Sequence, residues 1–283
     1  MILKIPVEDR VSTYPGRVVL TPVPGETNMF DMVRADEPIT SGTPINKALL
    51  DNKAYTLTSD VTLYVTPSGN DVNGDGSIDA PYKTIQKAVD AIPKHLGGHT
   101  ATISTDMGVY AERVTVDGFA SGRLVISRPG ELAIITGGID IINSSFVEVN
   151  IYQIERDANS SRPLFVAKEG SNVIIYSDMI LDGIDMGVTG MIVERDSHLV
   201  AVIPTVLTFN NCAATATAQW CSFISLNTIT GKDNMFGMVA SQGGIVSYNT
   251  DTTLKNWSNS ADSGGLVLTG KNSTDLSDAT LDL

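Results

Sequence analysis

The stretch Asp71–Asp79 has the oxygen-rich pattern of a calcium-binding loop. Side-chain oxygens recur at every second position: Asp71, Asn73, Asp75, Ser77 and Asp79. Gly76 stands where an EF-hand loop turns sharply, but the twelfth position, which normally supplies a bidentate glutamate, is Tyr82. The pattern indicates a weak calcium site, the one cofactor that the sequence suggests. A turn without metal is the favoured alternative, because Asp, Asn and Gly also cluster where the backbone turns tightly.

A second group of acidic residues could serve an enzyme that degrades polysaccharides. Such chemistry needs two carboxylates, or a base with a charged partner, in one groove. Asp178 and Asp182 lie in one short run, and Glu194 ends the next run. These three are the candidate acid and base residues. Because no complete catalytic constellation can be read from the sequence, solvated corner residues without a catalytic role are the favoured interpretation.

Charge and composition exclude several classes of partner. The net charge is −13, so the phosphate backbone of a nucleic acid would be repelled, and no nucleic-acid partner is expected. No run of eighteen apolar residues occurs, so membrane insertion is not expected either. The first residues lack the apolar segment and cleavage site of a signal peptide, so synthesis in the bacterial cytoplasm without a signal peptide is expected.

Short alternating apolar runs recur through most of the chain. They start at residues 100, 123, 146, 172, 198, 223 and 244, so the steps are between 21 and 26 residues. A period of this length indicates a solenoid, in which each coil contributes a few strands and buries its apolar face only against its neighbours. About seven repeats of a parallel β-helix are therefore predicted, with coils over 100–270. A β-sandwich is the alternative, but its hairpins would recur every 8–12 residues.

One amphipathic helix is predicted before the first coil. Apolar residues at Ile85, Ala88, Val89 and Ile92 follow the helical spacing, so Thr84–Ile92 should be helical. Because the open end of a solenoid exposes strand edges and apolar side chains, we interpret residues 62–95 as an N-terminal cap.

Residues 1–58 differ from the rest and are predicted to be a separate, irregular region. They hold six of the 12 prolines, which disfavour a regular sheet. A strand is expected over residues 16–23 and a short helix over residues 43–52. Residues 59–283 would form the β-helical domain.

The stretch Tyr64–Pro93 resembles the opening segment of pectin-lyase-like right-handed β-helix proteins. It reads YVTPSGNDVNGDGSIDAPYKTIQKAVDAIP and covers about thirty residues. The resemblance implies an all-β, right-handed parallel β-helix with an N-terminal α-helix, but no activity, since that fold serves lyases, hydrolases and inert tailspikes. Gly108–Glu112 is similar to the first short motif of pectin methylesterases. Their catalytic motifs are missing, so a structural role is expected for it.

The stretch Tyr14–Asn52 resembles the opening of tail-fibre and baseplate-associated proteins of phages and prophages. The runs that carry the resemblance are RVVLTPVPGETNMFDMVRAD and GTPINKALLD. It implies that residues 1–58 attach the chain to other tail or baseplate proteins in the virion, and that the β-helix forms a homotrimer that contacts a cell-surface glycan or protein of the host. A structural tail protein is thus expected. The alternatives are a polysaccharide depolymerase on the same fold and a secreted adhesin.

Overall fold

The computed structural model describes residues 11–12, 18–22, 30–34, 38–40, 56–127, 132–185, 187–250, 259–270 and 280–282. The contacts divide the chain into two compact units. One is Leu3–Tyr55, and the other is Thr56–Leu283 together with Met1–Ile2.

The first unit contains two small antiparallel pairs of strands. Strand β1 (Val11–Ser12) pairs with β4 (Pro38–Thr40), and β2 (Val18–Pro22) pairs with β3 (Phe30–Arg34). Strand β2 confirms the strand expected over residues 16–23. The helix expected over residues 43–52 lies outside the described residues.

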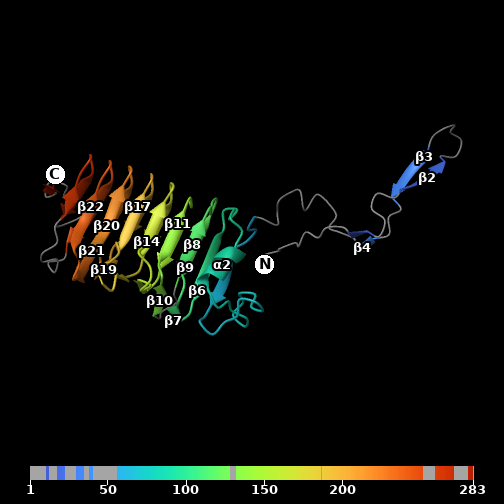
Figure 1. Ribbon diagram of the computed structural model, residues 1–283, viewed down its shortest axis with the longest axis horizontal. Helices are drawn as coiled ribbons and strands as arrows, with labels where there is room; N and C mark the ends of the chain where they lie inside the picture. The colour runs from blue at the N-terminus through green and yellow to red at the C-terminus, as the bar shows by residue number, and fades with distance from the viewer. Residues whose placement is uncertain are drawn as a thin grey trace. The chain divides into compact units, whose positions relative to one another are not determined.

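The second unit is a parallel β-solenoid of about six turns (Figure 1). After β5 (Val61–Val65), the first five coils contribute three strands each, and in the sixth coil β21 belongs to both the first and the second column of strands. The coils are β6 (Thr100–Thr105), β7 (Gly108–Tyr110), β8 (Val114–Asp117); β9 (Arg123–Ser127), β10 (Ala133–Thr136), β11 (Ile139–Ile142); β12 (Val147–Asn150), β13 (Gln153–Glu155), β14 (Phe165–Lys168); β15 (Asn172–Ile175), β16 (Met179–Asp182), β17 (Met191–Glu194); β18 (His198–Ala201), β19 (Val206–Asn210), β20 (Ala214–Gln219); and β21 (Phe223–Lys232), β22 (Phe236–Ala240). They continue into β23 (Ile245–Thr250), β24 (Ser260–Ala261) and β25 (Leu266–Gly270).

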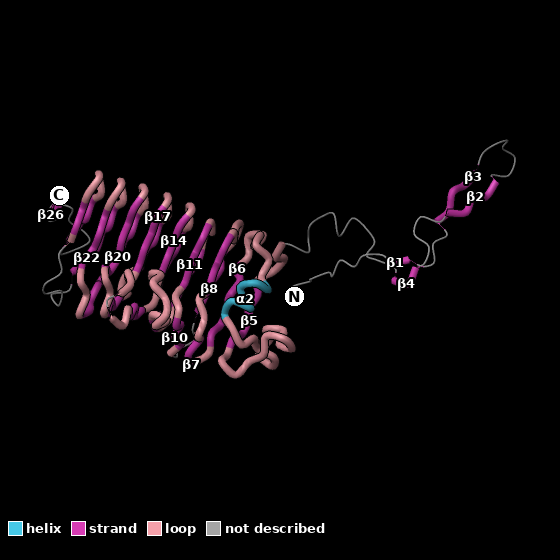
Figure 2. Tube along the Cα trace, in the orientation of Figure 1, coloured by secondary structure: helices cyan, strands magenta, loops and turns pink. Residues whose placement is uncertain are grey.

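The strands stack in three columns, and Figure 2 shows members of the third column, from β8 to β22, as a row of parallel strands. The first column runs β5-β6-β9-β12-β15-β18-β21-β23-β25, the second runs β7-β10-β13-β16-β19-β21, and the third runs β8-β11-β14-β17-β20-β22-β24. All seven predicted runs lie in the first column. The predicted solenoid is confirmed, although about seven repeats were expected and the stack has about six turns.

Aliphatic side chains that share a register position fill the inside of the stack. Leu124, Val147, Val173, Leu199 and Ile224 are partners in successive strands of the first column. Each of them is at most 1% exposed. Residues at the same register position in neighbouring strands point to the same face of the sheet. The inward residues of successive coils therefore form one continuous core.

A ladder of serines forms the corner between the third and first columns. Ser144, Ser171, Ser197 and Ser222 are buried at successive coils. The backbone N–H of each of the first three donates to the hydroxyl of the next, over 3.2, 3.0 and 3.2 Å. The residues directly before these serines have positive φ, as at Asn143 (47°) and Asp196 (58°), and this left-handed backbone turns the chain. The ladder therefore satisfies backbone donors that the corner would otherwise bury unpaired.

The predicted helix forms as α2 (Ile85–Ala91), with Thr84 as its N-cap residue. It packs against β5, β6 and β8, and Ile85, Ala88 and Val89 are fully buried. Its role as the cap of the coil stack stays a prediction. No helix among the described residues is long and apolar enough to span a membrane.

The loop between β5 and α2 covers the free edge of β5. The Tyr64 amide donates to the Gly76 carbonyl over 2.8 Å, and the Tyr82 amide donates to the Tyr64 carbonyl over 3.0 Å. At the other end of the first column, β26 (Thr280–Asp282) pairs antiparallel with β25. Both outer strands of this column are thus paired with non-solenoid segments over part of their length, which removes free edges.

Candidate binding pocket

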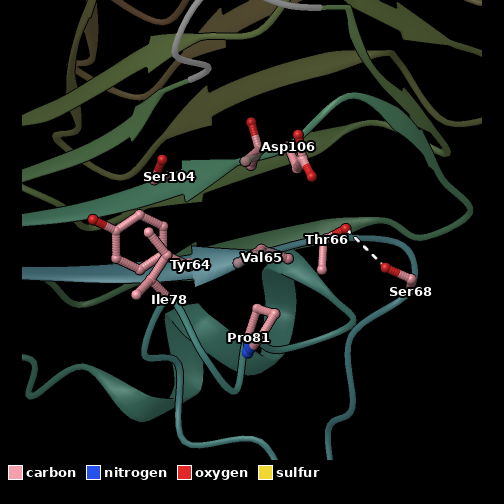
Figure 3. Close-up of a pocket in the computed structure, with 9 residues that line it drawn as sticks. Tyr64, Val65, Thr66, Ser68, Ile78, Pro81, Ser104 and Asp106 are labelled. Carbon is pink, nitrogen blue, oxygen red and sulfur yellow. Dashed lines mark hydrogen bonds between the residues drawn. The ribbon is translucent and has the colours of Figure 1, made fainter.

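The pocket that we identify lies between the outer face of β5 and β6 and the loop that precedes α2 (Figure 3). Its volume is about 290 Å³. The lining residues are Tyr64, Val65, Thr66, Ser68, Ile78, Pro81, Ser104, Thr105 and Asp106. The strands supply one wall and the loop supplies the other.

The first wall of the pocket consists of side chains that point outward from β5 and β6, because residues along a strand alternate between the two faces. Leu63 and Val65 point into the core, so Tyr64 points outward, and its register partner in β6 is Ser104. Asp106 follows β6 and is exposed; its Oδ1 accepts a hydrogen bond from the Met107 amide over 2.9 Å. An aromatic ring, a hydroxyl and a carboxylate thus occupy the same side of the sheet.

The second wall of the pocket is a turn in the loop before α2, and side-chain-to-backbone hydrogen bonds hold its shape. The Asp75 carboxylate accepts a hydrogen bond from the Ser77 amide over 2.9 Å, and the Ser77 hydroxyl accepts one from the Ala80 amide over 3.2 Å. Gly76 has a φ of 80°, and a Cβ there would lie 2.7 Å from the Tyr82 ring, so this position requires glycine. The resulting turn carries Ile78 with 69% of its surface exposed, next to Pro81 in the lining.

The five predicted calcium ligands are engaged with the protein or exposed. Asp71 accepts hydrogen bonds from the Lys83 and Thr84 amides over 2.7 and 3.1 Å and from the Thr84 hydroxyl over 2.8 Å, so it fixes the start of α2. Asn73 and Asp79 are exposed. Within the described parts of the chain, no group of three or more His, Cys, Asp or Glu side chains could hold a metal ion. Calcium binding through the oxygens of this loop stays a prediction.

Hydrogen bonds shift the pKa of two of these carboxyls. Partial burial raises the pKa of Asp71, but the hydrogen bonds from Thr84 and Lys83 outweigh it, so the pKa lies below its ordinary value. The hydrogen bonds from Ser77 likewise lower the pKa of Asp75. Both residues therefore carry negative charge beside the pocket at neutral pH.

The three predicted acid and base residues lie apart from one another along the coils. Asp178 precedes β16 and accepts from the Val206 amide over 2.7 Å, whereas Asp182 ends β16 and accepts from the Asn211 side-chain amide over 2.9 Å. Four residues of extended chain separate the backbones of Asp178 and Asp182 by about 13 Å. Glu194 belongs to the third column and accepts from Gln219 over 2.8 Å.

The register gives Asp182 a different carboxylate neighbour. Glu155 is its partner one coil earlier, at a strand spacing of about 4.8 Å. The sequence analysis missed this pair because the two residues are 27 positions apart and become neighbours only through coil stacking.

The motif Gly108–Glu112 has a structural role. Tyr110 is 2% exposed, and its hydroxyl lies 3.0 Å from the Val65 carbonyl and 2.9 Å from the Asp106 carbonyl, either of which can accept its proton. The two oxygens of Glu112 accept the amides of Ile85 and Gln86, over 2.7 and 2.9 Å. A carboxylate from the first coil therefore holds the first turn of α2.

A buried ion pair is another feature that the sequence analysis did not find. Asp140 is 2% exposed, and Arg113 approaches it with two nitrogens, at 2.8 and 2.5 Å. Arg162 reaches the same carboxylate at 2.5 Å. The acidic residue in the middle of the apolar run IDII could have indicated this ion pair, because a charge that is buried in the core needs a partner of opposite charge.

Three aromatic side chains of the coils are partly exposed: Tyr176 at 49%, Phe236 at 46% and Trp220 at 41%. Tyr248, by contrast, is only 5% exposed. None of the three exposed rings lines the pocket.

Comparison of the chain with protein-family models, with curated proteins and with solved structures gives no match. The functional conclusion therefore depends on the sequence patterns and on the geometry of the solenoid and its pocket.

Proposed function

We propose that the protein is a structural component of a phage or prophage tail, which projects from the particle and mediates attachment to the host surface. The observation that supports this proposal is the stack of parallel coils. Nine strands lie in the first column, from β5 to β25, and eight steps of about 4.8 Å give a length of about 38 Å. Such a stack holds its outward residues at fixed intervals, which suits a projecting element.

The proposal assigns partners to both parts of the chain. Residues 1–58 would bind other tail or baseplate proteins, in keeping with their resemblance to virion attachment segments. The solenoid would assemble as a homotrimer and contact a host glycan or protein. Sedimentation of the purified protein at several concentrations would then give the mass of three copies, and a single-copy mass would contradict the trimer.

The location of the protein in particles tests the proposal most directly. Particles purified on a density gradient should contain the chain, and a truncated chain that lacks residues 1–58 should be missing from them. If the full chain is not found in particles that otherwise carry complete tails, the virion role is wrong.

Incubation with host glycan tests the alternative enzymatic role. The structural role predicts no new reducing ends and no unsaturated products. Turnover that is lost in Asp182→Asn would instead establish a depolymerase that uses the carboxylates near β16.

A further inference from the structure

We propose that the pocket between β5, β6 and the loop 66–81 binds a single uncharged pyranose ring. The inference deepens the proposed attachment role, because it names a ligand class and a place of contact. It rests on the lining residues, their free hydrogen-bonding groups, the local charge and the pocket volume.

The apolar part of the lining suits the ring face of a sugar. Tyr64 presents its ring outward from β5, and Figure 3 shows it beside Ile78, with Pro81 at the edge of the same pocket. The electron-rich face of an aromatic ring attracts weakly positive C–H groups, and these line the faces of a pyranose. Ile78 keeps 69% of its surface exposed although it is apolar, so a ligand in the pocket would cover surface that otherwise faces water.

The polar part of the lining has unused hydrogen-bonding capacity. Among the described residues, no partner is found for the Tyr64 hydroxyl, the Ser104 hydroxyl or Oδ2 of Asp106. The hydroxyls of Thr66 and Ser68 lie 3.3 Å apart and can each take a further partner. Donors and acceptors thus surround an apolar surface, which is the combination that a polyhydroxylated ring requires.

The negative charge at the pocket disfavours the binding of acidic sugars. Among the described residues that line the pocket there is no Lys, Arg or His, and Asp106 is part of the lining. Asp75 lies in the loop that forms the second wall and is ionised at neutral pH because its pKa is lowered. A uronic or sialic acid would face like charge without a counterion, whereas the hydroxyls of a neutral sugar can donate to Asp106.

The volume limits the ligand to one ring. A space of about 290 Å³ lies just below the usual range for small-molecule pockets, which begins at about 300 Å³. Further residues of a glycan would have to extend into solvent.

Saturation-transfer NMR with methyl pyranosides tests the proposal. The full chain is mixed with the methyl glycosides of glucose, galactose, mannose and N-acetylglucosamine, and with methyl glucuronide as the charged probe. At least one neutral glycoside should receive saturation, and methyl glucuronide should receive markedly less than methyl glucoside. Tyr64→Ala should weaken binding about three- to tenfold, the range expected for the loss of one aromatic contact.

Matched variants distinguish binding in the pocket from binding elsewhere on the surface. Tyr176→Ala removes a tyrosine that is 49% exposed outside the pocket, so it should leave the signal unchanged. Ile78→Ser and Asp106→Asn alter exposed residues and keep the test valid if Tyr64→Ala does not fold; each should weaken binding. The proposal is overturned if no neutral glycoside receives saturation, if Tyr176→Ala and the pocket variants have equal effects, or if glucuronide binds as well as glucoside.

Failure of this proposal can be distinguished from failure of the proposed function. A chain that is present in particles but binds no sugar would contradict only the pocket assignment. A chain that binds sugar but is missing from particles would contradict only the virion role.

Discussion

Glu112 links the first coil to the start of helix α2. Both of its oxygens accept backbone amides at the start of the helix. Burial raises the pKa of Glu112, although the hydrogen bonds from Gln86 and Ile85 act in the opposite direction. The folded state therefore holds the proton of this residue more tightly than the unfolded chain does, and this favours folding at acid pH.

Replacement of Glu112 by alanine should lower the free energy of unfolding by about 1 to 2 kcal/mol, because two helix amides lose their acceptor. The loss should be larger near pH 4.5, the ordinary pKa of the residue, than near pH 7, since the contribution of a group with a raised pKa declines as the pH rises. Urea unfolding at both values measures it. Asp117→Ala, an exposed carboxylate of the same coil, should change stability by less than about 0.5 kcal/mol. A loss that grows toward neutral pH would contradict the direction of the pKa shift.

Asp71 should have the opposite dependence on pH. Its pKa is lowered, so its stabilising effect is present above the ordinary pKa of 3.8 and is lost as the pH falls through the folded value. Asp71→Asn should therefore be less stable than the wild type near neutral pH, and the stabilities of the two proteins should converge as the pH falls below the folded pKa of Asp71. Acid titrations of the far-UV circular dichroism would reveal this convergence. A constant difference across the whole range would show that charge at Asp71 does not matter.

At the scale of elements, the serine ladder explains how the corners of the coils remain buried. One or two residues with positive φ turn the chain, and a serine hydroxyl then accepts a hydrogen bond from the backbone of the preceding coil. The ladder stops at Gly244, where a Cβ would lie 2.2 Å from the Ala218 carbonyl oxygen. The spacing of serine or glycine at residues 144, 171, 197, 222, 244 and 265 is the sequence signal for these corners.

Ser171→Ala should lower the free energy of unfolding by about 1 to 3 kcal/mol, because the Ser144 amide is left buried without an acceptor. Hydrogen exchange of the Ser144 amide should accelerate as well. Ser145→Ala is the matched control, since that serine is exposed and its hydroxyl makes only a 3.4 Å contact. Equal effects of both variants would mean that the ladder contributes no stability of its own.

At the scale of the whole solenoid, strand pairing joins each coil to the coils before and after it. Asn172 and His198 are register partners, as are Met179 and Leu207, and Met191 and Ala216. The coil over residues 172–197 is therefore equivalent in register to the next coil. Stability in such an array is close to a sum over coils and their interfaces.

Deletion of residues 172–197 should leave a folded solenoid that is shorter by about 4.8 Å, because His198 then takes the place of Asn172. Circular dichroism, cooperative thermal unfolding and small-angle scattering would measure this outcome. Deletion of residues 172–184 is the control: it ends within a coil, breaks the register of every later strand and should prevent folding of the second unit. A full-coil deletion that unfolds the protein as completely as the control would contradict the independence of the coils.

The sequence by itself determined the solenoid. Alternation of apolar residues is a local property of each strand, and its repetition every 21 to 26 residues is legible without any structure. The helix over Ile85–Ala91 was predictable for the same reason, since its apolar spacing and its N-cap lie within nine residues of one another.

Only the tertiary structure decided which side chains meet. Glu112 reaches Ile85, Asp140 meets Arg113 and Arg162, and Tyr64 lies beside Ser104 because the coils stack in one register. That register depends on the length and conformation of every intervening turn, so it cannot be read from the spacing of any single run. For this reason the sequence pointed to carboxylates at Asp178, Asp182 and Glu194, while the described structure places the pocket at β5, β6 and the loop before α2.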